Sequence, residues 1–154
     1  MENTSILFTS SDLGIGYTLQ DCCNSLTHLN NWQERYRQLF KLASKIIPLS
    51  DDLKLDKYLV KGCENSVWLH HYFDNVEQKH YFLADSNSKI IQGLLVIILS
   101  AVNGQTAKVI LSIQLEPLLL SLQLGKYLTP SRANGLVSVM NKIQEFVKES
   151  SRAK

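Results

Sequence analysis

The chain has 154 residues, of which 45% are hydrophobic and 19% are charged, and its net charge is +2. This length and composition predict one globular domain and exclude a disordered chain. Because no cluster of Lys and Arg is longer than two residues, a nucleic-acid-binding protein is not expected.

Three cysteines occur, Cys22, Cys23 and Cys63, and this odd, small number does not fit a disulfide framework. The first residues lack the charged segment and long apolar stretch of a secretory signal. The most apolar stretch, residues 90–102, is too short to span a bilayer. We therefore expect a cytoplasmic protein with free thiols and no membrane segment.

The first third of the chain is expected to form a flexible N-terminal arm followed by two helices. Residues 1–17 show no hydrophobic period, so they are predicted to form the arm. Thr18 and Asp21 have the spacing of a capping box, which predicts a short helix from that point. Asn30-Asn31 is expected to end this helix and to cap a second one over residues 32–47, where apolar residues recur at helical spacing.

The middle of the chain is predicted to form a small antiparallel sheet of about three strands. Segments 58–60, 66–73 and 80–84 are rich in aromatic and aliphatic residues, and short polar connections join them. The second and third segments would form a hairpin, and a tight turn would join the first segment to the second.

A buried central helix is predicted over residues 88–102, because this segment is apolar nearly all round. Asp85 or Ser86 is expected to cap it. Further helices are expected over 106–111, over 117–122 and from Thr129-Pro130 onward. Together the elements predict an α/β chain of the α+β type, with several helices packed on the sheet in one domain over residues 18–150.

Cys63 is the residue best suited to carry chemistry. Gly62 precedes it, and Glu64 and Asn65 follow it, in the turn between two predicted strands. A turn on a rigid scaffold can present a nucleophilic thiol to a partner. This local context alone favours the alternative, a cysteine that packs as a small hydrophobic residue.

The other candidate side chains do not complete a catalytic or metal site. His70 and His71 are expected on opposite faces of one strand and His80 on the next, so a Cys–His pair is not favoured. Cys22 and Cys23 are adjacent on a helix and point about 100° apart, so they do not share a ligand sphere easily. No Cys-x-x-Cys or His-x-x-x-His spacing indicates a metal site.

Residues 61–69 closely resemble the Gly-Cys-x-x-x-Val-Trp signature of SufE-type sulfur acceptors. Three further segments resemble the family in the same order, at 31–36, 84–95 and 128–136. The resemblance covers roughly residues 30–148, and Glu64-Asn65 and the stretch 94–106 look most like the CsdE branch.

The resemblance implies a SufE/IscU-like fold and a role as an accessory sulfur-transfer protein, not an enzyme. It implies that a PLP-dependent cysteine desulfurase, SufS- or CsdA-like, passes persulfide sulfur to Cys63 and is stimulated by doing so. The sulfur would continue to a downstream acceptor or iron–sulfur scaffold. The PLP belongs to the desulfurase, so neither a cofactor nor a metal is expected in this chain. Asp85 and Arg132 match recurrent family positions and are candidate supporting residues.

Arg132 has two interpretations, because it is expected in the first turn of the last helix, where a cation opposes the helix dipole. The favoured one is an ion pair with Asp85, and the other is a charge that favours a nearby thiolate or a carboxylate of the partner. Trp32 and Trp68 are expected in the core. No role is assigned to Cys22, Cys23, His70, His71 or the N-terminal arm.

Two other functions stay open. An iron–sulfur scaffold would need about three or four thiolate or imidazole ligands at one site, and only Cys63 lies in a suitable place. A cysteine-independent adaptor would dock to a partner without using Cys63.

Overall fold

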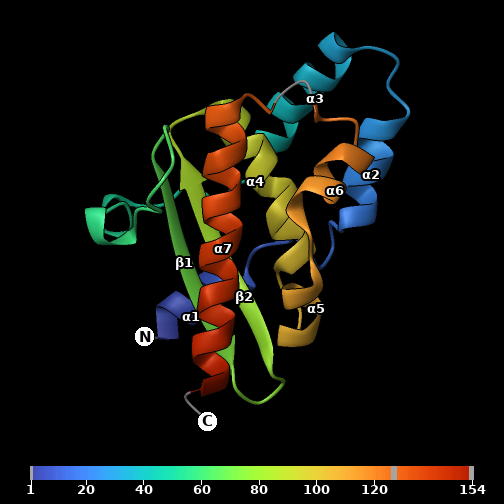
Figure 1. Cartoon of the computed structure of the whole chain (residues 1–154). Helices are drawn as coiled ribbons and strands as arrows, with labels where there is room; N and C mark the ends of the chain where they lie inside the picture. The colour runs from blue at the N-terminus through green and yellow to red at the C-terminus, as the bar shows by residue number, and fades with distance from the viewer. Residues whose placement is uncertain (1, 126–127, 153–154) are drawn as a thin grey trace.

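The computed structural model describes residues 2–125 and 128–152. At its centre lies a two-stranded antiparallel sheet of β1 (Val67–Asp74) and β2 (Lys79–Ser86). Helices pack around this sheet, and the long C-terminal helix α7 (Pro130–Arg152) lies along it (Figure 1). The α+β class is confirmed, with two strands in the described residues where about three were predicted.

The predicted third strand is reduced to one bridge. Leu59 bridges Trp68, and the Val60 N–H donates a hydrogen bond to the Val67 carbonyl at 2.9 Å. Gly62 then turns the chain away with a φ of 94°. The segment therefore follows only the beginning of β1.

The sheet has two different faces. Leu69 and His71 of β1 lie on the face toward α7, where the His71 ring stacks on Phe146 at a centroid distance of 5.1 Å. Residues on this face contribute to the main hydrophobic core. On the opposite face, Tyr72 and Leu83 belong to a second, smaller cluster.

The N-terminal segment is not the loose arm that the sequence predicted. Helix α1 (Glu2–Thr9) covers the second face of the sheet, and Phe8, which is only 3% exposed, stacks on Tyr72. Farther along, the Asn103 side-chain amide donates a hydrogen bond to the Leu13 carbonyl at 3.0 Å. Buried apolar side chains such as Phe8 thus hold the segment against the sheet, although the segment shows no helical periodicity. The first residue, Met1, lies outside the described residues.

Helix α4 (Lys89–Val102) is the buried central helix, as predicted. Its N-cap is Ser88, whose hydroxyl accepts a hydrogen bond from the Ile91 N–H at 3.4 Å. The prediction that Asp85 or Ser86 caps this helix is therefore wrong, because both residues are still part of strand β2.

Helix α3 (Trp32–Ala43) begins at its predicted cap, Asn31, and crosses α4 closely. At the crossing, a Cβ added to Gly93 would lie 2.4 Å from the Leu39 carbonyl oxygen, so glycine permits this contact. Trp32 is the first residue of α3, whose buried residues all lie in its second half, from Leu39 onward, and Trp32 is 47% exposed. The prediction of Trp32 as a core residue is wrong.

The remaining helices follow the predicted order. The capping box of Thr18 and Asp21 opens α2, as expected. The bounds are α2 (Leu19–Thr27), α5 (Ala107–Ser112) and α6 (Leu115–Ser121), with short 3-10 turns η1 (Asp51–Leu53) and η2 (Asp56–Tyr58). None of the described helices is long and apolar enough to cross a membrane.

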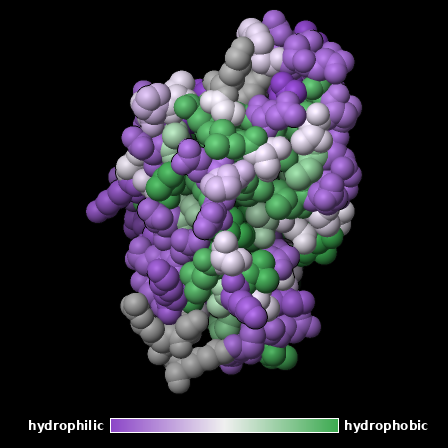
Figure 2. Space-filling model, turned by 45° about the vertical axis from the view of Figure 1, so that its right-hand side comes forward, coloured by the Kyte–Doolittle hydropathy of each residue, from purple (hydrophilic) through white to green (hydrophobic). Residues whose placement is uncertain are grey.

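Some hydrophobic side chains reach the surface on the side of α5 and α6. Figure 2 shows them gathered in the middle of this face, between hydrophilic margins. Leu120 and Val137 are 53% and 47% exposed and border a hollow between α6 and α7.

Candidate functional site

Cys63 lies in the turn that the sequence predicted, and Gly62 makes this turn feasible. The φ of Gly62 is 94°, which a residue with a side chain adopts only with strain. An added Cβ would also lie 2.6 Å from the Ser138 hydroxyl oxygen on α7. The turn is thus held close against the last helix.

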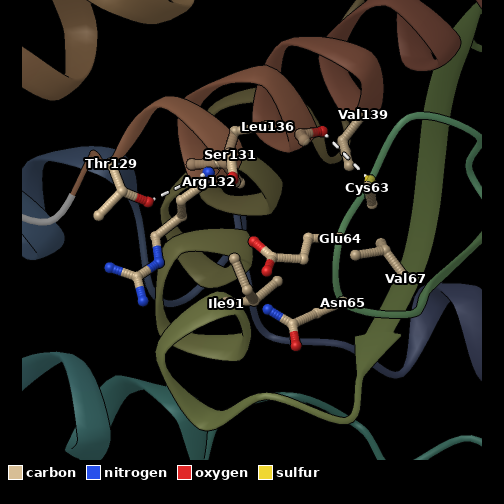
Figure 3. A pocket seen from close by; sticks show the side chains of 11 residues that line it. Cys63, Glu64, Asn65, Val67, Ile91, Thr129, Ser131, Arg132, Leu136 and Val139 are labelled. Atoms are coloured by element: carbon tan, nitrogen blue, oxygen red, sulfur yellow. Dashed lines mark hydrogen bonds between the residues drawn. The ribbon is translucent and has the colours of Figure 1, made fainter.

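The sulfur of Cys63 faces a small pocket between the turn, α4 and α7. Its Sγ donates a hydrogen bond to the Gly135 carbonyl at 3.3 Å (Figure 3). Apolar lining is supplied by Ile91, Leu136 and Val139. The cavity volume is about 40 Å³, and one water-sized atom needs about 10–15 Å³. The pocket thus has room for one additional sulfur atom.

The surroundings of Cys63 favour the protonated thiol in this conformation. Burial raises the pKa of the Cys63 thiol, because the low-dielectric surroundings disfavour the thiolate. The Gly135 carbonyl acts in the same direction, because it can only accept a hydrogen bond and so favours S–H. The side chain is half-buried, which leaves a route to the surface.

Arg132 lines the same pocket but does not reach the sulfur. Its backbone N–H donates to the Thr129 hydroxyl at 3.3 Å, so Thr129 caps α7 as the sequence predicted. In Figure 3 the Arg132 guanidinium points away from Cys63, and the Glu64 carboxylate lies between them. The structure therefore brings Arg132 to the pocket margin, where its charge faces outward.

Asp85 is a buried structural residue at the end of β2, only 2% exposed. Its carboxylate accepts hydrogen bonds from the Leu49 N–H at 3.2 Å and the Gln92 side chain at 2.9 Å. Its ion-pair partner is Lys54, at 3.6 Å, so the predicted pair with Arg132 is wrong. The reason is that the connector before β1 folds over Asp85, a contact that sequence spacing does not reveal.

The two adjacent histidines lie on opposite faces of β1, as alternation predicted. The His70 Nε2 is 2.8 Å from the Leu53 carbonyl oxygen. The His71 Nε2 is 2.8 Å from the Nδ1 of His80, and burial together with His80 lowers the pKa of His71 to about 4. Both rings are thus engaged away from Cys63, in agreement with the expectation that no Cys–His pair forms.

Cys22 and Cys23 differ in environment. Cys22 is fully buried, with its Sγ 3.6 Å from the Ser100 hydroxyl, and burial raises the pKa of its thiol. Cys23 is partly buried beside the core. Within residues 2–125 and 128–152, no three His, Cys, Asp or Glu side chains are grouped as a metal site.

Sequence reasoning missed the contacts that Gly135 and Ser138 make with the Cys63 turn. Gly135 is 72 residues away along the chain, and neither residue has a side chain that indicates chemistry. Only their one-turn spacing on a helix links them, and that spacing is common to many helix surfaces.

The chain is similar to a known family and to proteins of known name. Residues 20–147 match the SufE family, described as an Fe-S metabolism associated domain. The "Cysteine desulfuration protein SufE" of Wigglesworthia glossinidia brevipalpis is 35% identical over 79% of this chain and 81% of that protein. The "Sulfur acceptor protein CsdE" of Escherichia coli (strain K12) is 32% identical over 95% of this chain and 99% of that protein.

A solved structure shares the fold. The solution structure of a hypothetical protein from Thermus thermophilus superposes with a TM-score of 0.70 at 16% sequence identity. The match covers 88% of this chain and 97% of that chain. The family match spans most of the sequence, including the Cys63 turn, so this chain belongs to the SufE family.

Proposed function

We propose that this chain accepts a sulfur atom on Cys63 from the persulfide of a PLP-dependent cysteine desulfurase. It then carries the sulfur to iron–sulfur cluster assembly or another sulfur pathway. The observation that carries the proposal is the Cys63 thiol on a glycine turn beside a pocket of about 40 Å³. The names of the two relatives, a desulfuration protein and a sulfur acceptor, support the same role.

The chemistry is an exchange between sulfurs. The Cys63 thiolate attacks the terminal sulfur of the donor's persulfide, a new S–S bond forms on Cys63, and the donor's S–S bond breaks. The donor cysteine leaves as a thiolate, the transferred sulfur carries the persulfide's charge, and no external oxidant or reductant is needed. Removal of the product persulfide frees the desulfurase for another cycle, which would stimulate it.

The acceptor needs no base, PLP or metal of its own in this scheme. The residues that line the Cys63 pocket include no histidine. The donor supplies an already activated sulfur, and its PLP performs the cleavage of L-cysteine. The three free cysteines agree with a reducing cytoplasm as the place of transfer.

Cys63 is proposed to alternate between two positions. In the pocket, burial raises the pKa of its thiol and so protects it from reaction. Attack requires the thiolate, so the turn would swing outward to meet the donor. An unchanged position and exposure of Cys63 in a complex with the desulfurase would contradict this movement.

The proposal is tested by intact-protein mass spectrometry after incubation with a cysteine desulfurase and L-cysteine. One added sulfur atom is expected on the wild-type chain and none on Cys63→Ser. Cys22→Ser/Cys23→Ser is the matched control and should still be loaded. Loading of Cys63→Ser would contradict the proposal, and full stimulation by Cys63→Ala would favour the cysteine-independent adaptor. An iron-bound, coloured protein after reconstitution would revive the scaffold alternative.

A further inference from the structure

The outer edge of β1 is an open strand edge. Val67 accepts its outward bond from Val60, so by antiparallel alternation Leu69 and His71 also direct their backbone N–H and C=O groups outward. The antiparallel bridge of Leu59 to Trp68 sets the Tyr58 carbonyl opposite the Leu69 N–H, whereas the Leu69 C=O and the N–H and C=O of His71 have no hydrogen-bond partner among the described residues. The edge therefore offers unpaired donor and acceptor groups from the Leu69 carbonyl onward, beyond the part that residues 58–60 cover.

The outer edge of β2 is covered, in contrast. Backbone bonds join His80 to Gly104 and Gln105 at 2.7 and 2.9 Å. The Phe82 N–H donates to the Asn103 side chain at 2.7 Å. The chain thus closes one side of its sheet and leaves the other accessible to an added strand.

A groove of about 660 Å³ runs beside the open edge, between the 57–61 segment and α7. Val60, Leu69 and Phe146 supply apolar lining. An extended peptide that pairs with a strand edge gains affinity from main-chain hydrogen bonds and specificity from such adjoining side-chain contacts.

The groove is electropositive. Lys57, Lys61 and Lys142 line it against one acidic residue, Glu145, which lies 3.4 Å from the Lys142 ammonium. The remaining lysines, Lys57 and Lys61, are exposed. This charge favours an acidic occupant and opposes pairing with a second copy of the same lysine-flanked edge.

The groove adjoins the Cys63 turn. Ser138 lines the groove, and its hydroxyl oxygen would lie 2.6 Å from a Cβ on Gly62, the residue before Cys63. A segment bound in the groove therefore lies on one side of the turn, and the pocket for the sulfur lies on the other.

We propose that an acidic, extended segment of the sulfur-donating desulfurase occupies this groove and adds a strand to the outer edge of β1. The inference rests on the proposed function, because it assigns the surface that receives the donor. The added strand pairs with β1 beyond the part that Leu59 and Val60 cover. The lysines of the groove favour a segment with acidic side chains. The edge thereby aligns the donor with Cys63.

The charge of the groove is tested with Lys57→Glu/Lys61→Glu. The acceptor concentration that half-saturates the desulfurase should rise about tenfold at low ionic strength, because like charges would face the acidic segment. The turnover of the desulfurase at saturating acceptor should change little. Added salt should reduce the difference in half-saturating concentration between the variant and the wild-type chain. The matched control is Lys41→Glu/Lys108→Glu, which makes the same charge change at exposed lysines of α3 and α5.

The strand pairing is tested by hydrogen exchange of Cys63→Ser with the desulfurase that loads the wild-type chain. The amide of His71 should exchange rapidly in the free chain and at least about tenfold more slowly in the complex. Unchanged hydrogen exchange at saturating desulfurase would overturn the added strand. An equal rise in the half-saturating concentration for the two lysine double variants would overturn the role of the groove's charge. If loading of wild-type Cys63 persists, only the docking inference fails; if no desulfurase loads Cys63, the proposed function itself fails.

Discussion

At the scale of the residue, Gly62 holds the Cys63 turn against α7. Gly62→Ala should lower the free energy of unfolding by about 1–3 kcal/mol, because alanine is strained at this positive φ. The added Cβ would also meet the Ser138 hydroxyl at 2.6 Å. Urea unfolding measures the loss.

A second substitution separates the two causes. Ser138→Ala removes the contact but leaves the backbone strain, so Gly62→Ala/Ser138→Ala should recover only part of the lost stability. Full recovery would show that the contact alone mattered. An unchanged stability of Gly62→Ala would contradict the need for glycine.

The position of Cys63 could be predicted from the sequence, because a glycine before a cysteine between apolar strands indicates a turn. Its contacts could not be predicted. The Gly135 carbonyl depends on how α7 docks, and the true ion-pair partner of Asp85 is Lys54 in a connector without a periodic pattern. Charge and family position had predicted Arg132 as the ion-pair partner of Asp85 instead.

At the scale of the element, Asp85 links strand β2 to the connector and to α4. Asp85→Ala should lower the free energy of unfolding by about 2–4 kcal/mol, because the buried Leu49 N–H and the Gln92 amide lose their acceptor. Lys54→Ala should cost less than about 1 kcal/mol, because the Lys54 side chain is 32% exposed and Asp85 keeps its hydrogen bonds from Leu49 and Gln92.

Chemical denaturation of both variants checks this order of effects. If Lys54→Ala destabilised the chain as much as Asp85→Ala, the ion pair would outweigh the buried hydrogen bonds. Sulfur loading of folded Asp85→Ala should be retained, because Asp85 does not line the Cys63 pocket.

Elements with clear end signals were predicted well, and those defined by packing were not. The capping box of α2 and the N-caps at Asn31 and Thr129 determine helix starts through local bonds. Helix α1 has no such pattern and is recognised only by the burial of Phe8 against the sheet. The predicted third strand did not form because Tyr58 belongs to the 3-10 turn η2, which leaves only Leu59 and Val60 extended beside β1.

At the scale of the whole molecule, the histidine pair under α7 should make the fold sensitive to acid. His71 contacts His80, Phe82 and Phe146, and its pKa is about 4 in the folded chain against an ordinary 6.5. Between these values the unfolded chain binds more protons than the folded chain. Stability should therefore be complete above pH 6.5 and fall by about 3 kcal/mol as the pH approaches 4.

Urea unfolding at a series of pH values from neutral to about 4 measures this slope. His71→Gln retains hydrogen-bonding capacity but cannot become an imidazolium, so its slope in this range should be smaller. The same slope in wild type and His71→Gln would show that other groups cause the acid sensitivity.

The resting partner of the Cys63 sulfur is the main-chain oxygen of Gly135. Every amino acid carries such an oxygen, so a systematic alanine scan of α7 would leave this acceptor untouched and report it as unimportant. Weakening it requires replacing the amide that contains the Gly135 carbonyl with a backbone ester. This replacement would show how much the hydrogen bond to Gly135 contributes to keeping the Cys63 thiol in its pocket between sulfur transfers.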